Sequence, residues 1–205
     1  MLKNEKGFAH VLVIVLAVVI IGSTGVAVAA NNSLPGDALY GIGRAIENAQ
    51  MRIAFGDDAK AARQVDYAEK RFEELTTIAN DNAKIENIDI ALEQYERGLE
   101  DALARTETAR SNGVNVDDVL ERLTEAQLRQ AATLQEVHER VPDEAKEAIA
   151  RAQEASVRGF ERSAEAVGAE RATEIQNRVR GEKPNIDDLL RGVPEGFPVN
   201  QSRPE

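Results

Sequence analysis

The chain has 205 residues and a net charge of −11 at pH 7, and it contains neither cysteine nor tryptophan. The lack of cysteine excludes a disulfide framework, a thiol nucleophile, a cysteine-ligated metal site and the lipid-bearing cysteine of a lipoprotein. Residues 1–30 hold two lysines and one glutamate, so the remainder carries about −12 and is repelled by nucleic acid and anionic lipid. Solubility explains this charge most simply, and binding of a cation or a basic partner is the alternative.

The N-terminus has the pattern of an export signal or a membrane anchor. Lys3 and Lys6 precede an uncharged stretch from Phe8 to Ala30. As an uncleaved anchor, these 23 residues give about 34 Å of helix, enough to cross a bilayer core of roughly 30 Å. As a signal peptide, the stretch has an apolar core and a small-residue end that predicts cleavage near Ala29-Ala30. Both interpretations remain open at this point.

Charge placement predicts the orientation of this segment. The lysines precede the apolar run, and no basic residue follows it until Arg44. The N-terminus is therefore expected in the cytoplasm and the body outside, either as a single-pass anchored domain or as a periplasmic or extracellular one.

A third interpretation of the N-terminus is a pilin-like filament component. Lys6-Gly7-Phe8 resembles the junction cut in type IV prepilins. Those proteins normally carry Glu five positions into the cut product, where this chain has Leu12.

Residues 33–180 are expected to form one acidic helical domain, because apolar residues recur there at intervals of three and four. Glycine, asparagine and proline positions divide it into five expected helices, at about 37–55, 57–79, 85–110, 116–140 and 142–180. Residues 181–205 hold four prolines and read as a mostly disordered tail, in which 185–190 could form one helical turn.

The second and third expected helices carry unbroken apolar seams joined by the short turn Asn80-Asp81-Asn82. Such seams are typical of coiled-coil-like packing in an antiparallel hairpin. In the fourth, Gln127 and Gln130 interrupt the seam. The predicted fold class is all-α: an N-terminal membrane or signal helix, then an antiparallel bundle of about four to five helices.

The sequence predicts no enzyme and no cofactor. His10 lies in the export segment, which leaves His138 as the one imidazole base of the body. Nucleophilic catalysis needs a nucleophile, a base and an orienting group, and no such set is recognisable. His138 next to Glu139 reads as an ordinary surface residue.

The weak candidate for a metal site is an acidic stripe on the third expected helix. Its carboxylates recur at steps of three and four, so neighbours are about 5–6 Å apart, where a hard cation such as calcium could offset their repulsion. A solvated face is the simpler interpretation. The stripe consists of Glu86, Asp89, Glu93, Glu96 and Glu100.

Ser33-Leu-Pro-Gly-Asp-Ala-Leu-Tyr40 and then Ala68-Glu-Lys-Arg-Phe-Glu-Glu74 resemble a bacterial family known as domain of unknown function 5667, as does Val141-Pro-Asp-Glu-Ala-Lys-Glu-Ala-Ile149. The resemblance extends over about Ser33–Val167 and implies an exported all-helical domain without an established activity. Gly41-Ile42-Gly43 departs from the family's pattern, and two helical glycines there would delay the first helix. The turn motif of this resemblance comprises Leu34, Pro35, Gly36, Asp37, Leu39 and Tyr40.

A second resemblance is Leu123-Thr-Glu-Ala-Gln127, which is similar to the Leu-Thr-x-x-Gln motif of periplasmic stress chaperones. The motif usually occurs twice and at a helix cap, whereas this copy is single and lies within a helix.

The sequence therefore predicts a non-enzymatic interaction module of the bacterial envelope, which binds another envelope protein by helix-in-groove or bundle-edge contacts. A chaperone-like or cation-responsive stress protein and the pilin-like component are the alternatives. Nucleic acid is not an expected partner, the membrane is contacted through the N-terminal segment, and no oligomeric state is predicted.

Overall fold

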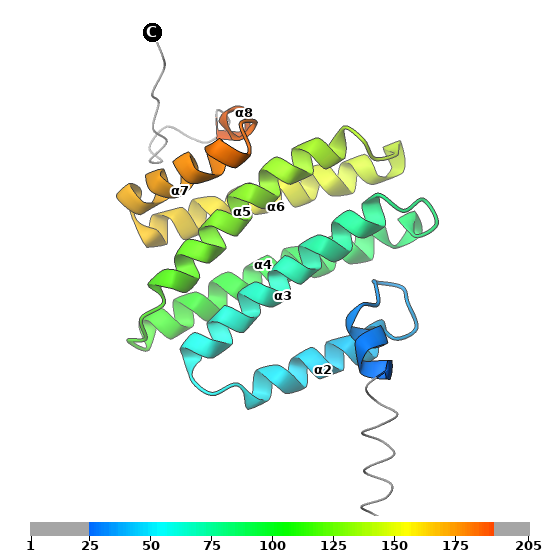
Figure 1. The fold of residues 1–205 in the computed structure, drawn as a ribbon, viewed down its shortest axis with the longest axis horizontal. Coiled ribbons are helices and arrows are strands. Elements are labelled where there is room, and N and C mark those ends of the chain that lie inside the picture. The colour runs from blue at the N-terminus through cyan, green and yellow to red at the C-terminus, as the bar shows by residue number, and fades with distance from the viewer. Residues whose placement is uncertain (1–24, 191–205) are drawn as a thin grey trace, which may run out of the picture. The chain divides into compact units, whose positions relative to one another are not determined.

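The structure is a computed structural model that describes residues 25–190, in two compact units that divide after Ile53. Unit 1 comprises residues 25–53 and unit 2 comprises residues 54–190 (Figure 1). The described residues form helices and no strand, which confirms the all-α prediction. Within residues 25–190, no helix is long and apolar enough to cross a membrane. The pilin-like junction lies outside the described residues. The predicted export segment lies outside them as far as residue 24, and its residues 25–30 are described.

In unit 1, residues 25–31 are helical and α2 spans Tyr40–Ile53. The turn motif connects them. The Leu34 carbonyl accepts the Asp37 N–H at 2.9 Å, and the Asp37 carboxylate accepts the Leu34 N–H at 2.9 Å. Gly36 has a φ of 93°, which suits the third position of a type II turn preceded by proline.

The two glycines of α2 do not delay the helix, because α2 begins at Tyr40 and includes both. Gly43 is required by packing. A Cβ there would lie 2.4 Å from the carbonyl oxygen of Ala30, whereas a Cβ at Gly41 would meet nothing within 4 Å. The departure from the family's pattern therefore permits a close approach of α2 to residue 30.

Unit 2 is built from two helical hairpins that pack into a four-helix bundle (Figure 1). In each hairpin the two helices pack along one another, and the hairpins join through α4 with α6 and α3 with α5. The helices are α3 (Asp57–Ala79), the 3-10 helix η1 (Ile85–Asn87), α4 (Ile88–Ser111), α5 (Asp117–His138), α6 (Asp143–Val167), α7 (Ala169–Glu182) and α8 (Ile186–Leu190).

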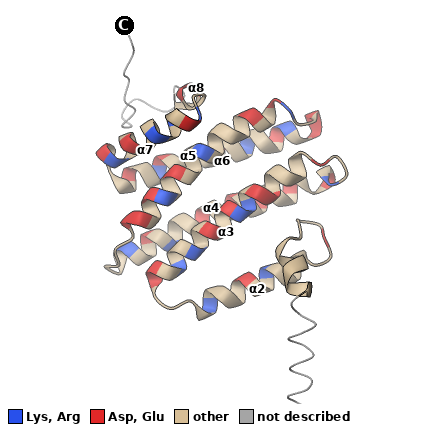
Figure 2. Ribbon diagram, in the orientation of Figure 1, with Lys and Arg blue, Asp and Glu red and all other residues tan. Residues whose placement is uncertain are grey.

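The predicted seams lie in the core. The predicted seam of the second expected helix is buried at all positions but Phe72, and that of the third at all positions but Ile85, which confirms the predicted hairpin. The buried seam positions are Ala61, Val65, Ala68, Leu75 and Ala79 in the second helix and Ile88, Leu92, Tyr95, Leu99 and Ala102 in the third. Charged residues occur along all the long helices of unit 2 (Figure 2), and two of them, Arg71 and Glu74, are buried as an ion pair at 2.7 Å. The fully buried seam side chains include Val65, Leu75, Leu92, Tyr95 and Leu120.

The predicted helix from Pro142 to Arg180 is two helices. Gly168 separates α6 from α7 with a φ of 89°, a conformation that side-chain-bearing residues rarely adopt. The packed chain also continues past the predicted domain boundary at residue 180. Ile186 and Leu190 of α8 are buried in a cluster with Phe160 and Ile175, so the predicted turn of helix at 185–190 is part of the core.

A polar layer crosses the middle of the bundle. The Tyr95 hydroxyl of α4 donates to Gln130 Oε1 of α5 at 2.9 Å and shares a 2.5 Å hydrogen bond with Ser156 of α6. Ser163 donates to Gln127 Oε1 at 2.7 Å. The two glutamines that interrupt the seam in the sequence are thus buried residues with partners on other helices. Burial raises the pKa of Tyr95 above its ordinary value of 10.0, opposed by the hydrogen bond with Ser156, so the phenol is protonated at neutral pH.

Substitution of Tyr95 by Phe tests this layer. The variant leaves buried Gln130 without the phenol donor, and we expect a loss of about 1–3 kcal/mol in the free energy of unfolding. The triple variant Tyr95→Phe, Gln130→Leu, Ser156→Ala removes all three partners together and is expected to lose less than the single variant. Urea unfolding followed by circular dichroism measures both. An unchanged single variant, or a triple variant with additive losses, would contradict the role of the layer.

Candidate functional site: a charged groove between two helices

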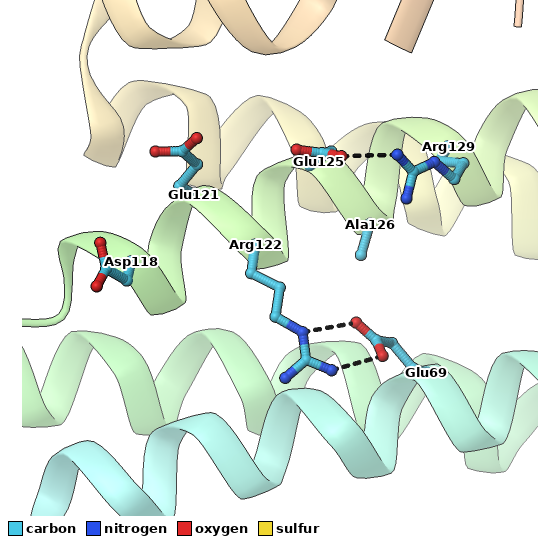
Figure 3. A pocket seen from close by; sticks show the side chains of 7 residues that line it. All are labelled: Glu69, Asp118, Glu121, Arg122, Glu125, Ala126 and Arg129. Carbon is cyan, nitrogen blue, oxygen red and sulfur yellow. Dashed lines mark hydrogen bonds and ion pairs between the residues drawn. The ribbon is translucent and has the colours of Figure 1, made fainter. Parts of the chain in front are cut away.

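Several linked charges of unit 2 lie along α5. Its residues 118, 121, 122, 125, 126 and 129 recur at intervals of three, one, three, one and three, which places them on one face of the helix. Together with Glu69 of α3 they line an open groove of about 370 Å³ (Figure 3). The lining side chains are Glu69, Asp118, Glu121, Arg122, Glu125, Ala126 and Arg129.

Arg122 connects the two helices that border the groove. Its Nε and Nη2 donate to the two carboxylate oxygens of Glu69 at 3.1 and 2.7 Å (Figure 3). Its Nη1 donates to Asp66 at 2.6 Å. The bidentate geometry matches the guanidinium fork to a carboxylate. The hydrogen bonds that Arg122 donates to Glu69 are the main reason that the pKa of Arg122 is raised; partial burial opposes this shift and Asp66 adds to it.

Glu121 and Glu125, which line the same groove, also pair with arginines of α7. Arg178 lies 3.1 Å from Glu121 and 2.5 Å from Glu125, and Arg171 lies 3.3 Å from Glu121. Arg129 also contacts Glu125, at 2.6 Å. The groove therefore presents carboxylates that are already shared between exposed guanidinium groups.

Chemically, this arrangement suits recognition of charged groups. Four carboxylates and two guanidinium groups line the groove, and carboxylates bind cationic nitrogen donors. Its openness to water lets an incoming charge exchange with the existing ion pairs at low cost, because exposed pairs are worth roughly 0–1 kcal/mol. In the sequence, the groove is indicated by the charged residues that recur at helical spacing on α5. The acidic stripe on α4 has the same kind of spacing.

The acidic stripe lies on η1 and α4, and part of it is ion-paired. Glu93 bonds to Arg97, and Glu96 lies 3.6 Å from Arg151 of α6. Within the described residues, no group of three or more His, Cys, Asp or Glu side chains is arranged to hold a metal ion. Cation binding by the acidic stripe, which comprises Glu86, Asp89, Glu93, Glu96 and Glu100, stays a prediction.

The turn motif and the chaperone-like motif both have structural roles, one in a turn and the other in the core. The turn motif forms the type II turn of unit 1. In the chaperone-like motif, Leu123, Thr124 and Gln127 are all buried, and Thr124 donates to the Leu120 carbonyl in mid-helix at 2.7 Å. Those three side chains stabilise the bundle and are inaccessible to a client. His138 is the last residue of α5.

The fold and the groove define a class of protein: a helical bundle with a charged groove on its surface. The chain belongs to the family described as Domain of unknown function (DUF5667), whose model matches residues 32–144, more than half of the sequence. The match confirms the family resemblance and includes the turn motif. It ends in the first turn of α6, before the predicted limit at Val167, so α7 and its arginines lie beyond it. No curated protein and no solved structure matches the chain.

A double-mutant cycle on Arg122→Gln and Glu69→Gln tests the link across the groove. Bidentate geometry between two helices predicts a coupling energy of about 1 kcal/mol, the upper end for exposed pairs. The matched control is Arg158→Gln with Glu154→Gln, a 3.6 Å pair within α6 for which we expect about 0.3–0.5 kcal/mol. Chemical unfolding at low and high salt measures both cycles. Equal coupling in the two cycles would contradict a special role for Arg122.

Proposed function

We propose that the protein is a non-enzymatic helical interaction module of the bacterial cell envelope. The α3–α5 groove carries this proposal, because it is a hollow on the bundle whose lining side chains are almost all charged. Its partner would be another envelope protein that offers a segment rich in lysine or arginine. The acidic body is exported, with the N-terminal residues on the cytoplasmic side.

Charge complementarity supports a basic occupant. Carboxylates outnumber guanidinium groups four to two in the groove, and the body outside residues 1–30 carries about −12. The side chains of Glu121 and Glu125 are only 24% and 18% exposed, so water screens their charges less than it screens a fully exposed carboxylate. A basic segment lying along α5 would compete with Arg171 and Arg178 for these oxygens.

A lysine-rich helical peptide and its glutamate-substituted counterpart, titrated onto the full chain by calorimetry, test the proposal. We expect the basic peptide alone to bind, with affinity that falls as salt rises. The groove variant Asp118→Asn, Glu121→Gln should weaken binding on the order of fivefold, since each exposed pair contributes roughly 0.2–1 kcal/mol.

The matched control is Asp101→Asn, Glu165→Gln, which removes the same charge from exposed positions of α4 and α6. Its affinity should stay near that of the wild type. Equal weakening in both variants would reduce the effect to net charge and reject the groove as the binding site.

A further inference from the structure

The first described residues carry apolar side chains that unit 1 leaves uncovered. Residues 25–29 read Gly-Val-Ala-Val-Ala, are helical, and none of them is buried. Val26 is 45% exposed and Val28 is 62% exposed. Two residues of helix correspond to about 200° of rotation, so these two valines are exposed on opposite sides.

Exposure on opposite sides favours lipid as the cover. A second protein chain packs against one face of a helix, whereas acyl chains surround it. The sequence before residue 25 supports the same occupant, because it is uncharged from Phe8 onward and is long enough with residues 25–30 to cross a bilayer. Ile42, at the start of α2, is a further apolar side chain of unit 1 that is 44% exposed.

The end of this helix is locked into the fold of unit 1. Ala30 is 1% exposed, and its carbonyl oxygen accepts the Ser33 hydroxyl at 2.6 Å. A Cβ at position 43 would lie only 2.4 Å from the same oxygen, so Gly43 allows α2 to approach Ala30. Small residues at positions 27–30 suggest a cleavage site in the sequence, yet at Ala30 the small side chain serves close packing against α2.

From these contacts we infer that the N-terminal segment is a retained anchor. Its last turn exposes Val26 and Val28 to lipid, and the Ala30–Gly43 contact joins it to α2. The bond between Ala29 and Ala30, the predicted cleavage position, lies inside helical residues 25–31, and the Asn32 N–H donates across it to the Val28 carbonyl at 3.2 Å. Proteolysis favours irregular backbone, whereas this bond lies within a helix and its second residue, Ala30, is buried. The inference rests on the proposed envelope function and decides between its tethered and released forms.

Single-cysteine labelling tests the lipid contact, because the chain has no cysteine of its own. Val26→Cys and Ile90→Cys report from positions that are both 45% exposed, the second on α4. Each full-length variant carries an environment-sensitive fluorophore and is reconstituted into phosphatidylcholine vesicles. We expect a blue-shifted emission quenched by spin-labelled lipid at position 26 and neither effect at position 90. The same response at both positions would overturn the inference.

Intact mass of the chain expressed in a bacterium gives a second test of retention. We expect full-length protein in the membrane fraction; a soluble species that begins at Ala30 or Asn31 overturns the anchor. That soluble species can still be titrated with the basic peptide. If that soluble species binds the basic peptide, the retained anchor is rejected and the proposed function is supported. If the chain is anchored but binds no basic peptide, the proposed groove function is rejected and the anchor is supported.

The contact between Ala30 and Gly43 has its own matched pair of variants. Gly43→Ala places a methyl group against backbone, and Gly41→Ala places one in open space, with the same gain in helix propensity. Hydrogen exchange should be at least tenfold faster at the Asn32 and Ser33 amides in the first variant, because their bonds to the 28 and 30 carbonyls loosen. Equal exchange in the two variants would show that the helix end is not locked to α2.

Discussion

Close approach of helices through small side chains is the constraint on which this structure depends. The chain has no disulfide and no tryptophan, so apolar area must be buried by many short contacts. At Gly98 of α4, a Cβ would lie 3.3 Å from the Ala68 Cα and 3.2 Å from the Arg71 Cγ of α3. Gly43 and Ala30 repeat this arrangement in unit 1. Backbones this close leave little room for adjustment, which makes the register of neighbouring helices matter.

The polar layer of Tyr95, Gln130 and Ser156 supplies that register. Alanine and leucine seams can slide past one another with a modest change in buried area, whereas a buried hydroxyl or amide displaced from its partner costs about 1–3 kcal/mol. The three residues come from α4, α5 and α6, so one set of hydrogen bonds aligns both hairpins of unit 2. The helix α5, which borders the charged groove, is thereby aligned with α4 and α6.

The apolar periodicity predicted the helices of unit 2, but it could not predict the role of polar residues and glycines that interrupt the apolar pattern. The seams of α3 and α4 identify a hairpin because apolar spacing alone determines which face is buried. Gln127 and Gln130 read as interruptions, since their partners lie on other helices and a single sequence does not reveal those contacts. Gly168 gave too weak a signal to split 142–180, because glycine within a helix is tolerated unless φ is positive. The groove was missed because charge at helical spacing also occurs on α4, and only tertiary packing brings Glu69 beside Arg122.

The proposed anchor and the proposed binding role of the groove would place different demands on the same acidic chain. A body of about −12 is repelled by an anionic leaflet, so it gains nothing by lying on the membrane surface. In the proposed anchored form, attachment would come from the uncharged segment, whose residues 25–30 end in the close approach of Ala30 to Gly43 of α2. Such anchoring would confine the chain to the membrane plane. Weak, salt-sensitive ion pairs at the groove would then suffice for the proposed partner in the same plane, because confinement raises the effective concentration. Release would remove that advantage, so a shallow charged groove is better suited to the retained form.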